Sequence, residues 1–306
     1  EVMELIPGIA GAWIGGLYTP NDGHAEPTKV TPALARAAER AGATVATGCN
    51  VEAVEVSGGK VVGVQTTRGT VRAPLVVCAA GAGSGWLARS LGLRLPQLVV
   101  RATVAETVPV PPVTPIGGWG PGGAFRQRPG GSFYVARSGD TDYDLTFDSF
   151  RYLREFLPNY RKNWRVFRIR PGAALWRDAR DAVASRDGDE RTAPLPVGEP
   201  KPNPRVVARA RDNLVRLFPG LAGIPLQRAW AGLIDTTPDA VPVIGPAGPE
   251  GFVLATGFSG HGFAMGPIVG KLLSELVLDG APSIDLSALR YARFGEGAMA
   301  QPKSLL

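Results

Sequence analysis

The chain has 306 residues, enough for two domains with separate cores, and its 44% hydrophobic and 20% charged residues are typical of a globular protein. It contains no run of about 18 apolar residues, no signal peptide, and no metal or disulfide spacing at its two cysteines, Cys49 and Cys78. We therefore expect a cytoplasmic protein without a metal ion, and the net charge of +6 favours anionic substrates or surfaces.

The first 90 residues predict short strands and one helix. Residues 12–19 are expected to form a strand, and a turn then leads to a helix that begins near Thr28 or Thr31 and ends at Arg40. Further strands are expected where β-branched residues cluster, at residues 44–46, 51–56, 61–66, 70–72 and 75–79. The turn Ser57–Lys60 joins two of them as a hairpin.

From about residue 95 to residue 227 the pattern changes to antiparallel strands joined by Gly and Pro turns, with strands expected at residues 99–107, 125–127 and 133–136. Residues 148–157 and 205–217 have the apolar spacing of amphipathic helices.

The segment Tyr160–Arg170 lies between these helices and holds five basic and three aromatic residues. It is consistent with contact to an anionic membrane surface or an electron acceptor, with nucleic-acid binding, or with a solvated edge of the domain. Because acidic residues follow it closely, we expect no nucleic-acid partner.

The stretch Ala255–Gly280 contains the clearest ligand-binding pattern. A strand at residues 252–255 leads into a loop rich in glycine, and apolar residues then recur on one helical face from Ile268 to Val277. Small residues let a ligand approach the backbone, and the free N–H groups of a helix N-terminus favour negative charge. The same pattern is also that of a strand, turn and helix without a ligand.

Five sequence strings point to one family. The string GFSGHGF before a helix resembles the C-terminal signature of the D-amino-acid-oxidase-like flavoenzymes, which include sarcosine oxidase, glycine oxidase and D-amino-acid dehydrogenases. YTPNDGHAEP, LVVCAAGAGSG, AFRQRPGGSFYVA and RAWAGLIDTTPDAVPVIG resemble other parts of the same superfamily. The resemblance covers most of residues 5–295.

This resemblance implies a mixed α/β fold with an FAD-binding Rossmann-like domain and an antiparallel-sheet substrate domain. The FAD-binding domain would comprise residues 20–90 and 228–306, and the substrate domain residues 91–227, with residues 1–19 adding a strand. The G-x-G-x-x-G fingerprint after a strand, which holds the FAD diphosphate in this family, does not occur in the chain, and GGWGPGG at residues 117–123 has no expected helix after it. We therefore expect at least about 30 residues of N-terminal βαβ structure elsewhere, on a second polypeptide, removed by cleavage, or upstream.

The resemblance also implies the site. The residues expected to contact FAD are Val51, Ala79, Ala80, Gly81, Gly232, Gly257, Phe258, Ser259, Gly260, His261, Gly262 and Phe263. The residues expected on the substrate side are His24, Arg126, Gln127, Asp235 and Ala264. His261 would stabilise charge on the reduced flavin, and Arg126 would position the substrate, because a guanidinium can grip a carboxylate through two parallel hydrogen bonds.

Two departures narrow these expectations. Gly232 stands where the sarcosine-oxidase branch has a cysteine that tethers the flavin, so FAD should be bound non-covalently. Ala264 stands where that branch has a carboxylate-binding lysine. We expect an FAD-dependent oxidation of an amine or amino acid, by an oxidase or a dehydrogenase, to an imine that hydrolyses. The alternative is a non-catalytic or regulatory flavin-fold subunit of a multi-chain complex.

Overall fold

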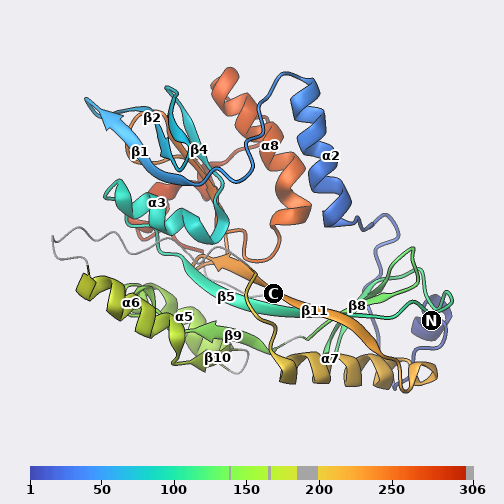
Figure 1. Cartoon of the computed structure of the whole chain (residues 1–306). Helices are drawn as coiled ribbons and strands as arrows, with labels where there is room; N and C mark the ends of the chain where they lie inside the picture. Colours follow the sequence, from blue (N-terminus) through green and yellow to red (C-terminus); the bar gives the residue numbers. More distant parts are fainter. Residues whose placement is uncertain (138, 165–166, 185–198, 301–306) are drawn as a thin grey trace.

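The structure is a computed structural model that describes residues 1–137, 139–164, 167–184 and 199–300. The fold is mixed α/β, with two small sheets in the upper part of Figure 1 and one long sheet in the lower part. Helices α2 (Pro27–Arg40) and α8 (Gly262–Leu278) both lie above the long sheet.

The upper part holds the two three-stranded sheets. One is an antiparallel meander of β1 (Val51–Ser57), β2 (Lys60–Thr66) and β3 (Gly69–Arg72). The other has the order β12 (Val243–Pro246), β13 (Phe252–Thr256) and β4 (Val76–Cys78), in which β13 and β4 are parallel. Val61, Leu95, Val243 and Phe252 are among the residues of the shared core, against which helix α3 (Ser84–Ser90) also packs through Leu87 and Ala88.

The lower part is a mostly antiparallel sheet in the order β10-β9-β5-β8-β7-β6, with β11 also paired to β5. Its strands are β5 (Leu98–Thr107), β6 (Gly118–Gly120), β7 (Gly123–Gln127), β8 (Phe133–Arg137), β9 (Thr141–Asp144), β10 (Phe167–Arg170) and β11 (Leu226–Thr236). The two long strands, β5 and β11, are antiparallel neighbours and extend from the upper part to the far end of the sheet.

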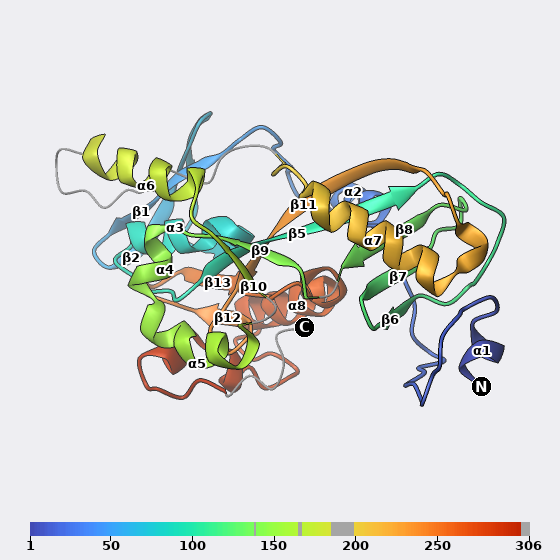
Figure 2. The ribbon, with the colours of Figure 1, turned by 90° about the horizontal axis from the view of Figure 1, so that it is seen from below.

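Helix α7 (Pro204–Leu217) covers one face of this sheet, as Figure 2 shows from below. Pro204 begins the helix, where its missing N–H is not needed, and the Asn203 side chain caps it by accepting a hydrogen bond from the Arg205 N–H. Leu214 of α7 packs against Phe125 and Val135 of the sheet. The opposite sheet face is therefore the one that looks toward α2 and α8.

The remaining helices lie at the edges. They are α1 (Val2–Leu5), α3 (Ser84–Ser90), α4 (Phe147–Arg151), α5 (Leu153–Asn163) and α6 (Ala173–Ala184), with short 3₁₀ turns at residues 81–83, 219–221, 287–289 and 291–294. None of the described helices is long and apolar enough to cross a bilayer.

Most sequence-based expectations for single elements are confirmed, including the hairpin at Ser57–Lys60 and the helices that end at Arg40 and Leu217. The strand predicted at residues 12–19 was wrong: this stretch pairs with no strand of the described chain, and Ile14 and Leu17 are fully exposed. The strand predicted at residues 44–46 is also absent, since the chain there runs irregularly between α2 and β1.

One helix differs from the expectation. The helix expected at residues 148–157 is two helices that meet at Tyr152, which is 1% exposed and anchors the junction in the interior. Helix α8 begins at Gly262, next to the start expected near Phe263 to Gly266. Within Tyr160–Arg170, Arg165 and Val166 lie outside the described residues. The domain boundaries expected at residues 90 and 227 stay a prediction.

Candidate functional site

A buried polar cluster joins the two loops that were expected to contact the flavin. Asp235, near the end of β11, accepts hydrogen bonds at its Oδ2 from the Gln97 side chain at 3.0 Å, from the Thr256 hydroxyl at 2.8 Å and from the Gly257 N–H. Gln97 also donates to the Gly81 carbonyl at 3.1 Å and accepts from the Gly85 N–H at 2.8 Å. The cluster therefore fixes residues 81–85 and the loop after β13 relative to β11.

The loop from Gly257 to His261 requires small residues. Gly257, Ser259 and Gly260 have φ values of 75°, 51° and 90°, a region that side chains other than glycine rarely adopt. A Cβ at Gly257 would lie 2.5 Å from the Thr237 methyl carbon. The Ser259 N–H donates to the Asp235 carbonyl at 3.0 Å, so the loop is tied back to β11.

This loop delivers the N-terminus of α8 to the surface. His261 is the N-cap residue, and no side chain caps the helix. His261, Phe263 and Ala264 are exposed, whereas Gly257 and Ser259 are buried. The first N–H groups of α8 thus carry the positive end of the helix dipole at an accessible surface, where an anionic or polarised ligand is favoured.

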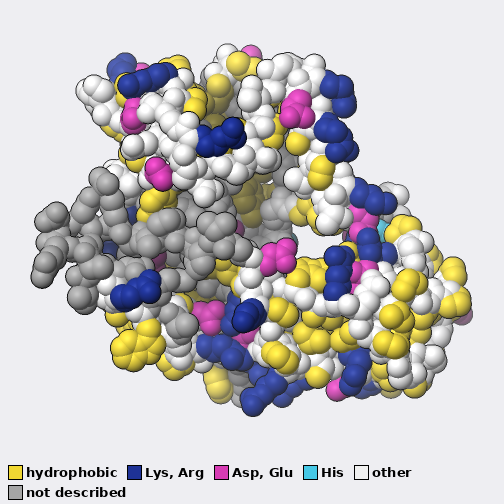
Figure 3. Space-filling view, in the orientation of Figure 1, with side chains coloured by type: hydrophobic (Ala, Val, Ile, Leu, Met, Phe, Trp, Pro, Cys, Tyr) yellow, Lys and Arg dark blue, Asp and Glu magenta, His cyan; other side chains and the backbone are white. Residues whose placement is uncertain are grey.

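The other residues expected to contact the flavin are mostly small and lie at accessible positions. Ala79 and Ala80 are exposed directly after β4, and Val51 at the start of β1 is 37% exposed. A Cβ added at Gly81 or at Gly232 would meet no atom within 4 Å. Figure 3 shows an opening between the upper part of the molecule and the long sheet, with charged side chains gathered along its right-hand side.

A row of side chains crosses four neighbouring strands on the sheet face opposite α7. The strand pairs place Arg126 opposite Tyr134, Tyr134 opposite Glu106, and Glu106 opposite Arg228. Trp230 lies two residues beyond Arg228 on the same face and packs edge-on against Tyr134, with ring centroids 5.2 Å apart. Gly232 follows two residues later, so β11 leads from the arginine row to the open surface above Gly232.

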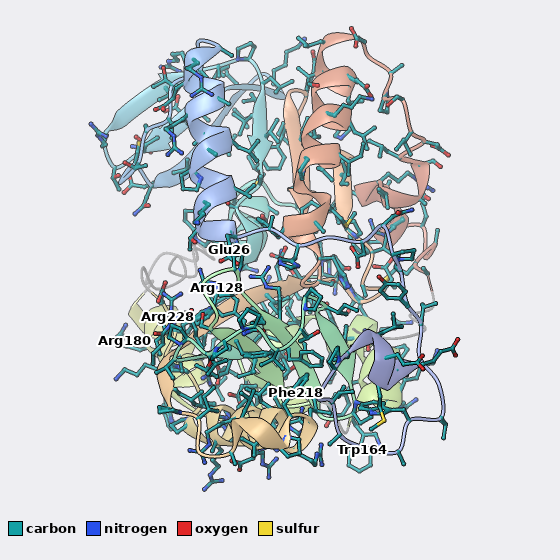
Figure 4. All side chains as sticks on the ribbon, turned by 90° about the vertical axis from the view of Figure 1, so that its right-hand side faces the viewer. Glu26, Arg128, Trp164, Arg180, Phe218 and Arg228 are labelled. Carbon is teal, nitrogen blue, oxygen red and sulfur yellow. The ribbon has the colours of Figure 1, made fainter. Side chains whose placement is uncertain are left out.

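Three arginines on this sheet face, Arg126, Arg128 and Arg228, are paired with two carboxylates. Glu106 is 1% exposed and binds Arg128, Arg228 and the Ser132 hydroxyl. Glu26, the N-cap of α2, binds Arg126 at 2.7 Å and Arg128 at 2.8 Å. Figure 4 shows Glu26, Arg128 and Arg228 along the boundary between α2 and the long sheet.

The arginines also set the ionisation of both acids. Burial raises the pKa of Glu26, but the hydrogen bond from Arg128 and the charges of Arg126, Arg128 and Lys29 outweigh it and leave that pKa lowered. Burial likewise raises the pKa of Glu106, while hydrogen bonds from Ser132, Arg228 and Arg128 lower it by more. Both groups are carboxylates at neutral pH, and the two acids leave one of the three arginine charges unbalanced.

A second concave region lies at the outer end of the sheet. It has a volume of about 560 Å³ and is lined by His24, Gln127, Arg128 and the backbone segments at residues 110–115 and 129–131. The Gln127 side chain accepts from the Val113 and Thr114 N–H groups and donates to the Pro111 and Gly131 carbonyls. It therefore organises this loop, and its expected contact with a substrate stays a prediction.

The structure thus divides the expected site residues into two groups. Gly81 and Gly257 are bonded into the cluster that Asp235 anchors, next to Ala79 and Ala80 on one side and residues 258–263 on the other, and Gly232 precedes Asp235 by three residues on β11. Arg126, Gln127 and His24 lie farther along the sheet. Sequence reasoning did not identify Gln97, Thr256, Glu26 or Glu106, and only Glu106 gave a signal, as an acid inside an apolar β-branched strand.

Comparison with known proteins identifies the family. The model of the family described as FAD dependent oxidoreductase matches residues 1–276. The chain belongs to this family. A D-amino acid dehydrogenase of Paramagnetospirillum magneticum is 28% identical over 297 residues, which are 96% of this chain and 57% of the relative. The mitochondrial dimethylglycine dehydrogenase of Mus musculus is 27% identical over 98% of this chain and 31% of the relative.

Solved structures of other proteins share the fold. An L-amino acid deaminase from Proteus myxofaciens, determined with anthranilate, superposes with a TM-score of 0.77 at 24% identity, covering 88% of this chain and 60% of that one. Glycine oxidase from Geobacillus kaustophilus gives 0.71 at 20% identity, covering 96% of this chain and 65% of that one. The chain spans about half to two thirds of the length of most of these proteins.

The residues of this family member fit a flavin. Open space above Gly81 and Gly232 leaves room for a flat ring system, and the uncapped start of α8 offers N–H donors to its polar edge. Gly232 has no thiol, so the tether seen in the sarcosine-oxidase branch cannot form there. The string GWGPGG at residues 118–123 has the G-x-G-x-x-G spacing, but it forms the hairpin of β6 and β7 and no helix follows it, so it is not the fingerprint that holds the diphosphate.

Proposed function

We propose that the chain is the larger part of an FAD-dependent enzyme that oxidises the C–N bond of an amino acid or a related amine. When bound, FAD supplies the two-electron oxidation, and the resulting imine hydrolyses in water. The observation that carries the proposal is the arrangement of the Asp235 cluster, which holds the loops at residues 79–81 and 257–263 beside the open surface above Gly232.

The residues of the chain would act in three ways. The α8 N-terminus and His261 would stabilise negative charge on the polar edge of the cofactor. Arg126 would orient the substrate through its carboxylate, and Tyr134 and Trp230 would give the pocket a wall of aromatic side chains. No protein base is assigned, because an amine that binds in its neutral form needs none.

The cofactor diphosphate would be held by polypeptide other than the 306 residues of this chain. The support for this proposal is strand β4, which lies at the edge of its sheet and so leaves one side of its backbone unpaired among the described strands. A further parallel strand there would bring a Gly-rich turn to the end of β4 where Ala79 to Gly81 lie. This polypeptide could belong to the same gene product or to a partner chain.

Contact with a membrane surface or an electron acceptor through Tyr160–Arg170 is a separate proposal. Trp164 is 56% exposed and Ile169 is 44% exposed, while Arg161 and Lys162 close helix α5 with positive charge. Binding of the purified protein to vesicles that contain anionic lipid, compared with neutral vesicles, tests this contact directly.

The test of the main proposal is spectroscopic. The intact gene product, with any chain that purifies with it, is examined for a flavin spectrum and then mixed without oxygen with single amino acids of D and L configuration and with N-methylated glycines. Bleaching of the flavin by one of them supports the enzyme and identifies the substrate class. A yellow protein that no amine reduces, or a colourless one, supports the non-catalytic subunit instead.

A further inference from the structure

Glu26 is shared between two arginines, one on each carboxylate oxygen. Its Oε1 accepts a hydrogen bond from Nη2 of Arg126 at 2.7 Å. Its Oε2 accepts from Nε of Arg128 at 3.0 Å and lies 2.8 Å from Nη2 of the same residue. Arg126 also donates to the Ala25 carbonyl at 3.0 Å. The segment that enters α2 therefore occupies the guanidinium that was expected to bind the substrate.

The two arginines are not held equally. Arg128 binds Glu26 through two nitrogens and also binds Glu106, which Arg228 and Ser132 fix in the sheet. Arg126 has one hydrogen bond to one carboxylate oxygen and one to a backbone carbonyl. Its side chain is 19% exposed. Arg126 can leave Glu26 while the charge of Glu26 stays neutralised by Arg128.

The charges of the cluster favour one further anion. Among the described residues, Arg126, Arg128 and Arg228 form ion pairs with two carboxylates, Glu26 and Glu106, so one of these three positive charges is unbalanced. The guanidinium groups of both Arg126 and Arg128 lie over the Tyr134 ring, at 5.3 and 4.6 Å from its centroid. An incoming carboxylate would complete the charge balance and could take both N–H groups on one side of Arg126.

We propose that Glu26 is an internal carboxylate that holds Arg126 in place and yields it to the carboxylate of an incoming substrate, while Arg128 retains Glu26. This inference rests on the proposed function, which supplies the amino-acid substrate. Glu26 is then a positioning residue that sets specificity: a ligand with a carboxylate can displace it from Arg126, and a neutral ligand of the same shape cannot. Glu26 also weakens carboxylate binding, because the ligand must first replace it.

The experiment measures binding of benzoate and of its neutral analogue benzamide to the intact protein by calorimetry. The variants are Glu26→Gln, Arg126→Met and the double substitution. Glu250→Gln is the matched control, since Glu250 pairs with Lys60 at 2.9 Å on a distant surface. We expect Glu26→Gln to tighten benzoate binding about tenfold and to leave benzamide unchanged, a difference of about 1.4 kcal/mol. Arg126→Met should weaken benzoate binding and remove the effect of Glu26→Gln.

Other results would overturn the inference. Unchanged or weaker benzoate binding in Glu26→Gln would show that Glu26 does not compete with the ligand. An equal gain in the Arg126→Met background would show a general effect of charge rather than exchange on Arg126. Should Arg126→Met fail to fold, Arg126→Lys replaces it, because lysine keeps the charge but not the paired N–H geometry.

The calorimetric result is separable from the proposed function. If no amine reduces the flavin and the benzoate pattern still holds, the proposed function fails and the exchange on Arg126 stands. If amino acids reduce the flavin and Glu26→Gln leaves benzoate affinity unchanged, the exchange fails alone.

Discussion

Gln97 donates a hydrogen bond of 3.0 Å to the carboxylate of Asp235, although the two residues are 138 positions apart in the chain. The same carboxylate oxygen receives the Thr256 hydroxyl and the Gly257 N–H. Together these hydrogen bonds join β11, the turn at Gly81 and the loop that leads into α8. The geometry of the proposed flavin site therefore depends on them.

Replacing Asp235 with Asn removes the charge that three donors share. We expect a loss of about 1–3 kcal/mol in the free energy of unfolding, because a neutral amide oxygen accepts these three buried hydrogen bonds more weakly than a carboxylate does, and a lower flavin content. Urea unfolding and the ratio of flavin to protein absorbance measure the two effects. Asp212→Asn, on the exposed face of α7, is the control, and an Asp235→Asn protein as stable as that control would contradict the prediction.

Glycine positions 232 and 257 should respond differently to alanine. At Gly257 the backbone φ is 75° and a Cβ would contact the Thr237 methyl carbon, so Gly257→Ala should lower the unfolding temperature by several degrees. At Gly232 there is open space, so Gly232→Ala should fold normally. A larger residue, as in Gly232→Val, should keep stability but reduce flavin binding. Normal flavin content in Gly232→Val would place the cofactor elsewhere.

The buried pair Arg293 and Asp239 should be the main attachment of the C-terminal segment. Arg293 is 2% exposed, donates to both oxygens of Asp239 at 3.0 and 3.2 Å, and also donates to the Val241 carbonyl at 2.7 Å. We expect Arg293→Met to cost about 3–5 kcal/mol in chemical denaturation, because the Asp239 charge stays buried without its partner. In the Arg293→Met background, Asp239→Asn should cost much less than it does alone. Equal costs in both backgrounds would show that the pair is not coupled.

Lowering the pH should reduce the free energy of unfolding, because Glu26 and Glu106 become protonated. The pKa of each carboxyl is lowered in the folded state from the ordinary value for a glutamate, which is about 4.3 in an unfolded chain. Their contribution to stability is therefore complete above about pH 4.3 and is lost as the pH falls through the folded-state values. The stability difference between the natural protein and Glu26→Gln should shrink in this range. A difference that stays constant from pH 7 to pH 3 would contradict the assignment.

The two thiols should react at different rates. Cys78 is 4% exposed, and burial raises the pKa of its thiol, whereas Cys49 is partly accessible. In the native protein a disulfide reagent at pH 8 should modify Cys49 first, and Cys49→Ser should remove the fast phase. Rapid modification of Cys78 would mean that the sheet formed by β12, β13 and β4 opens readily.

Local patterns predicted most elements but not the contacts among them. The β-branched run of β5 and the amphipathic spacing of α7 indicate a strand and a helix whatever surrounds them. Residues 12–19 looked like a strand as well, but Gly15 and Gly16 interrupt the apolar side chains, and the stretch pairs with none of the described strands. The break at Tyr152 depends on burial of that ring, which no local signal shows.

The candidate site was predictable where a sequence string carries it and not where distant residues meet. GFSGHGF indicated the loop before α8, and the positive φ values of Gly257 and Gly260 explain its glycines. The link between Glu26 and Arg128 joins residues 102 positions apart, and it depends on where α2 begins relative to the sheet. Arg126 alone therefore looked free to bind a substrate, whereas the fold supplies it with a partner.

The alternation of side chains along β11 makes the site sensitive to strand length as well as to composition. Arg228, Trp230 and Gly232 point away from α7, and Ala229 packs on the α7 side. Deleting one residue between Arg228 and Gly232 would move the Arg228 guanidinium to the apolar sheet face that packs against α7. It would also place an alanine beside Glu106. Insertions and deletions in related chains should therefore fall in the loops at either end of this strand. When the pocket is engineered, point substitutions should preserve the side-chain alternation, whereas grafted segments of different length should disrupt it.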